Sequence, residues 1–146
     1  MPFDANKFDS ARFSDRTSTV EVSTMAQFFD DGEDAVFVVR GLTGHELGIV
    51  NEAEQRAKAT DAVIESLASD NASEKINAIR EALGLSDDNV PSDVVRRQEM
   101  LCFGCVEPAL THEQAVKLCA AYPYEFYKLT NEIITLTGQG KTLGKP

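Results

Sequence analysis

The stretch Ala35–Leu47, AVFVVRGLTGHEL, combines a short strand with the start of a helix. Its first five residues are apolar and mostly β-branched or aromatic, which is typical of a strand buried on both faces. Thr43 and Glu46 then have the spacing of a capping box, in which each side chain accepts a hydrogen bond from a backbone amide at the helix start. The stretch therefore predicts a strand-to-helix switch.

The neighbouring segments extend this pattern into a mostly helical domain. Thr17–Ser23 alternates as a second strand would, and the acidic residues Asp30–Asp34 are expected to form a solvated turn. Apolar residues then recur at helical spacing, which predicts helices over about 44–68, 73–83, 93–106, 112–121 and 123–136, the last ending at Gly138. The expected fold is α+β, mostly α, with a small N-terminal β element of two strands packed against a C-terminal bundle of about four to five helices.

The chain divides into three parts. Residues 1–16 favour an extended flexible arm, because a five-residue spacing that matches neither helix nor strand separates its aromatic anchors Phe3, Phe8 and Phe13. A single globular domain is expected over 17–138, with the β element over 17–42 and the helices over 43–138. Residues 139–146 are rich in glycine and lysine and are expected to form a flexible tail.

Composition and charge argue against several classes of function. The 146 residues include 14 basic and 24 acidic side chains, a net charge of −10, whereas a sequence-independent grip on nucleic acid needs clustered lysine and arginine. No apolar run approaches the roughly 18 residues of a membrane span, and the N-terminus lacks the layout of a signal peptide. We expect neither nucleic acid nor a membrane as a partner, and a cytoplasmic location.

The candidate reactive residues are cysteines and histidines. Cys102 and Cys105 have the spacing of half a zinc site or of a redox dithiol, with His112 and Cys119 nearby. They lie in an apolar run without a second cysteine pair, so we interpret them as buried thiols of a helix, with a metal site as the alternative. His45 and His112 are expected at the surface. Without a nucleophile, phosphate-loop or dinucleotide motif, the sequence predicts a non-enzyme without catalytic residues, cofactor or metal.

Apolar helix residues are the candidates for binding. The second half of the third helix is apolar nearly all round, and the last helix has an apolar stripe, so each would line either the core or a groove for a partner. The arm is expected to dock on its own domain, on a neighbouring subunit or on a partner, and it is the candidate for a tether between the subunits of a homo-oligomer. The candidate partner or oligomer contacts are Phe3, Phe8, Phe13, Met100, Leu101, Phe103, Phe126, Leu129 and Ile133.

Several short motifs follow one another along the chain. They are Lys7-Phe8, Arg12-Phe13, Thr19-Val20-Glu21-Val22, Phe28-Phe29, the segment from Val38 to Gly44, Glu46-Leu47, Val106-Glu107-Pro108 and the segment from Asn131 to Gly140. In this order they resemble the tail assembly chaperones of long-tailed bacteriophages and prophages. The motifs belong to the scaffold, so the resemblance assigns no catalytic residue.

The resemblance implies a non-enzymatic factor of tail morphogenesis in the host cytoplasm. Such chaperones bind the long helical tape measure protein, keep it soluble, help to recruit the tail tube protein and are typically absent from the mature virion. Apolar helical faces of the partner must be shielded before assembly, and a strong net charge would keep the complex soluble. The alternative is a structural virion component, such as a minor tail or head–tail connector protein.

Overall fold

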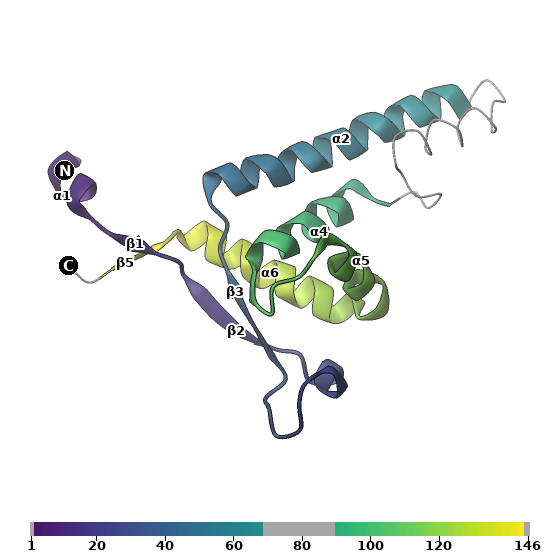
Figure 1. Cartoon of the computed structure of the whole chain (residues 1–146). Helices are drawn as coiled ribbons and strands as arrows, with labels where there is room; N and C mark the ends of the chain where they lie inside the picture. Colours follow the sequence, from purple (N-terminus) through teal and green to yellow (C-terminus); the bar gives the residue numbers. More distant parts are fainter. Residues whose placement is uncertain (1, 69–89, 145–146) are drawn as a thin grey trace.

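A computed structural model describes residues 2–68 and 90–144 of the chain (Figure 1). Strands β2 (Thr17–Glu21), β3 (Val36–Arg40) and β4 (Cys105–Glu107) form an antiparallel sheet with β3 in the middle. Most of the other described residues belong to four helices, namely α2 (Gly44–Ala68), α4 (Ser92–Gly104), α5 (His112–Ala121) and α6 (Pro123–Gln139). The α+β, mostly α, prediction is confirmed. The helix predicted over 73–83 lies outside the described residues.

The predicted strand-to-helix switch forms between β3 and α2. The Thr43 hydroxyl accepts from the Glu46 amide at 3.2 Å, and the Glu46 carboxylate accepts from the Thr43 amide at 2.9 Å. The same carboxylate binds both guanidinium nitrogens of Arg40, at 2.8 and 2.6 Å. Hydrogen bonding from Arg40, together with the Thr43 amide, lowers the pKa of Glu46 to about 2. Glu46 therefore caps α2 and also ties it to the last residue of β3.

The sheet gains a third strand that the sequence pattern does not predict. The helix expected over 93–106 ends at Gly104, and Cys105 continues as β4, opposite Val39 of β3. At position 104 a Cβ atom would lie 2.8 Å from Cγ1 of Ile133, so glycine lets α4 approach α6 closely. The backbone after Gly104 finds its hydrogen-bond partners along β3, which replaces a further helical turn.

Helix α6 continues beyond its predicted end at Gly138. It ends at Gln139, and the residue with left-handed backbone is Gly140, with φ of 72°. The joint between β3 and α2 holds this last part of the helix, since the Leu42 amide donates to the Thr137 hydroxyl at 2.9 Å. Gly41 lies against the backbone of α6, where a Cβ would be 2.9 Å from the carbonyl carbon of Leu136.

The two ends of the chain pair with each other and project from the rest of the molecule (Figure 1). The segment begins with α1 (Ala5–Ser10), whose cap Asp4 accepts from the Lys7 amide at 3.0 Å. Strand β1 (Phe13–Ser14) then runs antiparallel to β5 (Thr142–Leu143). We call residues 2–16 and 141–144 the arm, and the other described residues the body.

The arm corrects two expectations. Residues 1–16 were expected to be extended, but 5–10 are helical because Asp4 supplies an N-cap. The tail was expected to be a separate segment, but 142–143 provide the strand that pairs with β1. Neither local spacing nor composition reveals this pairing, because the two partners lie at opposite ends of the sequence.

Candidate binding surfaces

The helical candidates for partner contact lie in the core of the body. Met100 and Leu101 of α4 are buried, as are the three candidates of α6, Phe126, Leu129 and Ile133. Phe103 is half-buried and packs against the same core. Helix α6 is enclosed because α4, α5, β2 and β3 all contact it. In this conformation these residues line the core, which is one of the two roles that the sequence left open. Their contact with a partner stays a prediction.

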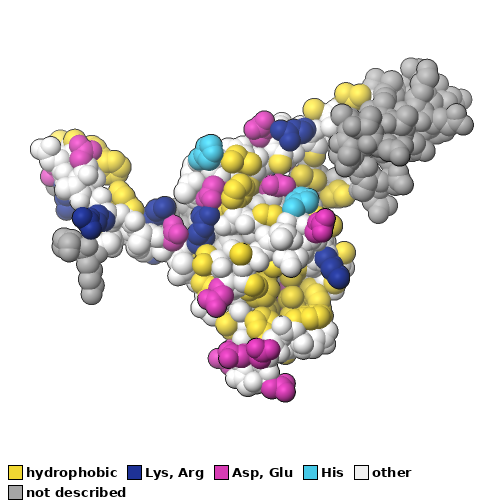
Figure 2. All heavy atoms as spheres, viewed as in Figure 1, with side chains coloured by type: hydrophobic (Ala, Val, Ile, Leu, Met, Phe, Trp, Pro, Cys, Tyr) yellow, Lys and Arg dark blue, Asp and Glu magenta, His cyan; other side chains and the backbone are white. Residues whose placement is uncertain are grey.

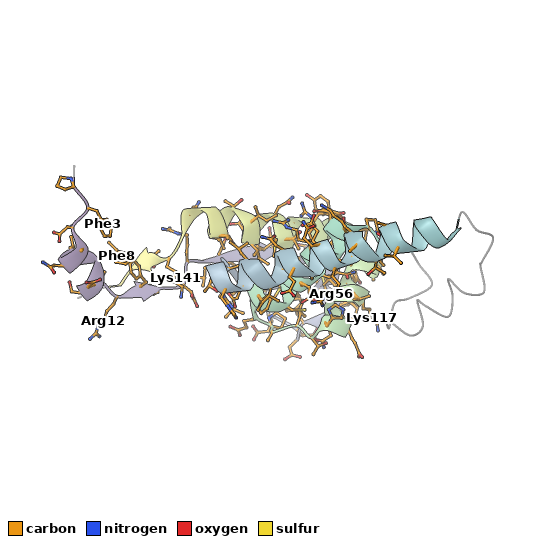
Figure 3. All side chains as sticks on the ribbon, turned by 90° about the horizontal axis from the view of Figure 1, so that it is seen from above. Phe3, Phe8, Arg12, Arg56, Lys117 and Lys141 are labelled. Atoms are coloured by element: carbon orange, nitrogen blue, oxygen red, sulfur yellow. The ribbon has the colours of Figure 1, made fainter. Side chains whose placement is uncertain are left out.

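The three phenylalanines of the arm lie together and are open to solvent. Phe3 is 75% exposed, Phe8 53% and Phe13 47%. Their rings form a continuous row, with centroids 5.4 Å apart between Phe3 and Phe8 and 5.7 Å apart between Phe8 and Phe13. Figure 3 shows Phe3 and Phe8 toward the end of the arm, with Lys141 near its base. The strand pairing also places the exposed Leu143 opposite Phe13.

We call these four residues, Phe3, Phe8, Phe13 and Leu143, the arm cluster. Beside it is a shallow hollow of about 450 Å³ between α1 and β5. The residues that line the hollow are Lys7, Ser10, Ala11, Arg12, Leu143 and Gly144. Sequence reasoning missed Leu143 because its place in the cluster depends on the pairing of the two chain ends.

A second exposed aromatic surface lies where the 3-10 helix η1 (Ser23–Phe28) meets the start of α6. Phe28 is 66% exposed, and its ring packs edge-on against Tyr122 with centroids 6.1 Å apart. The Tyr122 hydroxyl accepts a hydrogen bond from the Gln27 side chain at 3.2 Å. Tyr124, in the first turn of α6, is 75% exposed. We call Phe28, Tyr122 and Tyr124 the body face.

Acidic side chains border the body face. The loop that leads from η1 to β3 carries Asp30, Asp31, Glu33 and Asp34, all of them exposed. Figure 2 shows hydrophobic side chains gathered on this part of the molecule, with acidic side chains next to them at the lower end. The predicted solvated turn is confirmed, and Gly32 takes the left-handed conformation in it. A partner that combines apolar and basic groups would complement this surface.

A buried carboxylate lies beside the same elements. Glu125 is 5% exposed, and one of its oxygens accepts from the Thr24 hydroxyl of η1 at 3.0 Å. Its Oε2 has no hydrogen-bond partner within the described residues. The bond from Thr24 attaches η1 to the first turn of α6, and so helps to position Phe28 against Tyr122.

The three cysteines are free thiols that lie in the core or pack against it. Burial, followed by the nearby Cys102, raises the pKa of Cys105 to about 12. Burial, followed by the charge of Glu99, also raises the pKa of Cys102. A raised pKa disfavours the thiolate, which is the nucleophilic form of cysteine. Cys105 lies in β4, not in the helix where it was expected.

The histidines and acidic residues do not add a metal site to the described parts of the chain. His45 is exposed, and His112 lies 3.3 Å from the Glu99 carboxylate with most of its side chain in solvent. Over residues 2–68 and 90–144, no three His, Cys, Asp or Glu side chains are grouped so that they could hold a metal ion.

Comparison with known proteins adds no relative. No protein-family model, curated protein or solved structure matches this chain. Among the described helices, none has the length and apolar character needed to cross a lipid bilayer. Two exposed aromatic surfaces, the arm cluster and the body face, are the candidate binding surfaces of the described residues.

Proposed function

We propose that this chain is a non-enzymatic tail assembly chaperone of a long-tailed bacteriophage. It binds the tape measure protein in the host cytoplasm, keeps that protein soluble and helps to recruit tail tube subunits. The observation that carries the proposal is the body face, an uncovered aromatic surface bordered by acidic residues. The order of short motifs along the chain supports the identity of the partner.

The body face has the chemistry that an apolar helix requires. Aromatic side chains bury large areas at a low cost in conformational entropy, and they dominate the binding energy of many interfaces. Phe28 and Tyr124 are the most exposed aromatic side chains of the body. An amphipathic helix of the tape measure protein would place its apolar stripe over them, with the Tyr122 hydroxyl at the edge.

The charge of the chain favours a chaperone that coats its partner. The acidic loop 30–34 would attract basic residues that flank the apolar stripe of a helix. With a net charge of −10, coated complexes would also repel one another and stay in solution. Both effects weaken at high ionic strength, because exposed charges are screened.

A long partner requires many copies of a small chaperone. The chain therefore also acts as a homo-oligomer, for which the exposed arm offers a contact separate from the body face. Tail tube subunits displace the chaperone as they assemble, and it is absent from the mature virion. Stoichiometric amounts of this chain in purified particles would contradict this assignment and favour a structural virion component.

Co-expression with the tape measure protein encoded in the same genome tests the proposal. We expect the wild-type chain to keep the tape measure protein in the soluble fraction and to co-purify with it. Changing both Phe28 and Tyr124 to serine should abolish most of this effect, because an interface loses its aromatic anchors.

Val63→Ser on α2 is the matched control, since Val63 is also an exposed apolar residue, 53% exposed, and lies outside the body face. It should behave as the wild type. The proposal fails if the wild-type chain and the tape measure protein do not associate. A loss of solubility as large for Val63→Ser as for the double variant would show that the body face is not the binding surface.

A further inference from the structure

The arm has an apolar surface that the described residues leave uncovered. The rings of Phe3, Phe8 and Phe13 form one row, and Leu143 extends it across the strand pair. The hollow between α1 and β5 opens beside Leu143. Contiguous apolar surface of this kind on a small protein marks a site of association.

The arm also contains too little structure to be stable when it is fully solvated. Helix α1 has six residues, none of them buried, whereas isolated helices shorter than about 12–15 residues are marginal in water. Strands β1 and β5 have two residues each, and an isolated two-stranded ribbon is marginal as well. The two strands are joined by the Gly144 amide to the Arg12 carbonyl at 2.6 Å and by the Ser14 and Thr142 hydroxyls at 2.8 Å. At the base of the arm, Arg16 Nε donates to the Gly140 carbonyl at 3.1 Å, and Lys141 lies 3.2 Å from the Asp15 carboxylate.

Charge separates the arm from the rest of the chain. Acids and bases alternate along residues 2–16, in the order Asp4, Lys7, Asp9, Arg12, Asp15, Arg16. With Lys141 the arm has a net charge of +1. Since the whole chain has a net charge of −10, all the residues outside the arm together carry −11. Two bodies therefore repel each other, whereas two arms can oppose acids with bases.

We propose that the arms of two copies pack against each other about a two-fold axis and join the chain into a dimer. A two-fold contact uses the same patch on both partners, so the patch must be complementary to itself. The arm meets this requirement, with an apolar row and balanced charges around it. The body face does not, because its border is acidic. Since the arm projects from the body, the two bodies stay apart in such a dimer (Figure 1).

The size of the contact suits a reversible dimer. A fully covered aromatic ring buries about 150–250 Å², so three half-exposed rings and a leucine from each copy approach the roughly 1,000 Å² at which specific interfaces begin. The dimer itself does not depend on the proposed function, because the isolated chain can form it. Its biological role, the supply of several chaperone copies to one partner, rests on the proposed function.

The test is the molar mass of the purified full-length chain, measured by light scattering or sedimentation equilibrium over a wide range of concentration. We expect the wild type to reach twice 16.0 kDa. The double variant Phe3→Ser with Phe8→Ser should stay monomeric or dimerise at least tenfold more weakly. Its circular dichroism spectrum should match that of the wild type, which shows that the body is folded, because neither side chain contributes to the core.

The matched control changes Phe28 and Tyr124 to serine, which should leave the dimer intact. A wild type that is monomeric at every concentration would overturn the arm pairing, and so would loss of the dimer in this control. Mixing the arm variant with the body-face variant gives a third readout. A new complex between them would overturn two-fold pairing and indicate that the arm binds the body face of another copy.

These outcomes are independent of the chaperone proposal. A monomeric wild type that still keeps the tape measure protein soluble would contradict the arm pairing but not the chaperone function. A dimeric wild type that leaves the tape measure protein insoluble would contradict the chaperone function but not the arm pairing.

Discussion

Helix α6 and the arm both carry aromatic side chains, but those of α6 include a ring in the core, whereas those of the arm are exposed to solvent. Phe126 of α6 is completely buried, whereas Phe8 of the arm is about half exposed. The difference lies in the neighbours, since α4, α5, β2 and β3 surround α6, while β1 and β5 of the arm pair only with each other. The same residue type therefore stabilises the fold in one region and is available for association in the other.

Phe126→Ala should have the largest effect on stability. Removal of a fully buried ring leaves a cavity in the core, and we expect the free energy of unfolding to fall by about 3–5 kcal/mol. Urea denaturation followed by circular dichroism measures the change. A loss below about 1 kcal/mol would mean that α6 does not form the centre of the core.

Gly104→Ala tests the close approach of α4 to α6. The new Cβ would overlap the side chain of Ile133, and overpacking of this kind costs about 1–3 kcal/mol. The same denaturation experiment on the double variant with Ile133→Val provides the control, because valine lacks the methyl group nearest to the new Cβ. The two changes together should destabilise by less than the sum of their separate effects.

Glu46→Gln should have a smaller effect that depends on pH. Glutamine can keep the capping box but loses the ion pair with Arg40, which costs about 1–2 kcal/mol at neutral pH. Because the pKa of Glu46 is about 2 in the folded chain and 4.5 without its partners, its contribution is complete above pH 4.5 and is lost as the pH falls toward 2.

Denaturation midpoints of wild type and Glu46→Gln, measured from neutral pH downward, should therefore converge in the acid range. A difference that stays constant across this range would show that the ionised carboxylate contributes nothing beyond its hydrogen bonds. Arg40→Met is the complementary variant. In this background the difference in stability between Glu46 and the Glu46→Gln substitution should be small at neutral pH as well, because the partner of the ion pair is missing.

Phe8→Ala in the arm should have the smallest effect on folding. The residue lies outside the core, so the free energy of unfolding of the dilute chain should change by less than about 0.5 kcal/mol. Its effect should appear instead in self-association at high concentration. A loss of stability comparable to that of Phe126→Ala would mean that the arm folds as part of the body.

Features that depend on residues close together in the sequence could be predicted. The capping box at Thr43 forms as expected, and Thr111 with Gln114 forms a second one at the start of α5, since each requires only a partner three residues further along. Strand β3 and helices α2 and α5 follow from runs and periodicity over a few turns. The end of α4 was missed because the strand that replaces its last turn pairs with β3, far away in the sequence.

The candidate site was predictable only in part. The apolar stripes of α4 and α6 identify residues that avoid water, but they do not tell whether the same chain or a partner covers them. Phe28 and Phe29 illustrate the limit, since they are adjacent, yet Phe29 packs toward Phe37 while Phe28 remains exposed. Which of the two points inward depends on the course of η1 and its bond to Glu125.

The amino-acid sequence by itself determined the acidic charge, the α+β composition and the caps that start the helices, because each of these arises from single residues or from neighbours within one turn. Tertiary structure alone decided that the helical candidates form the core, that the chain ends pair and that the most exposed aromatic residues gather at two separate surfaces. Burial is a property of the whole packed chain, since a side chain leaves water only when segments distant in sequence cover it.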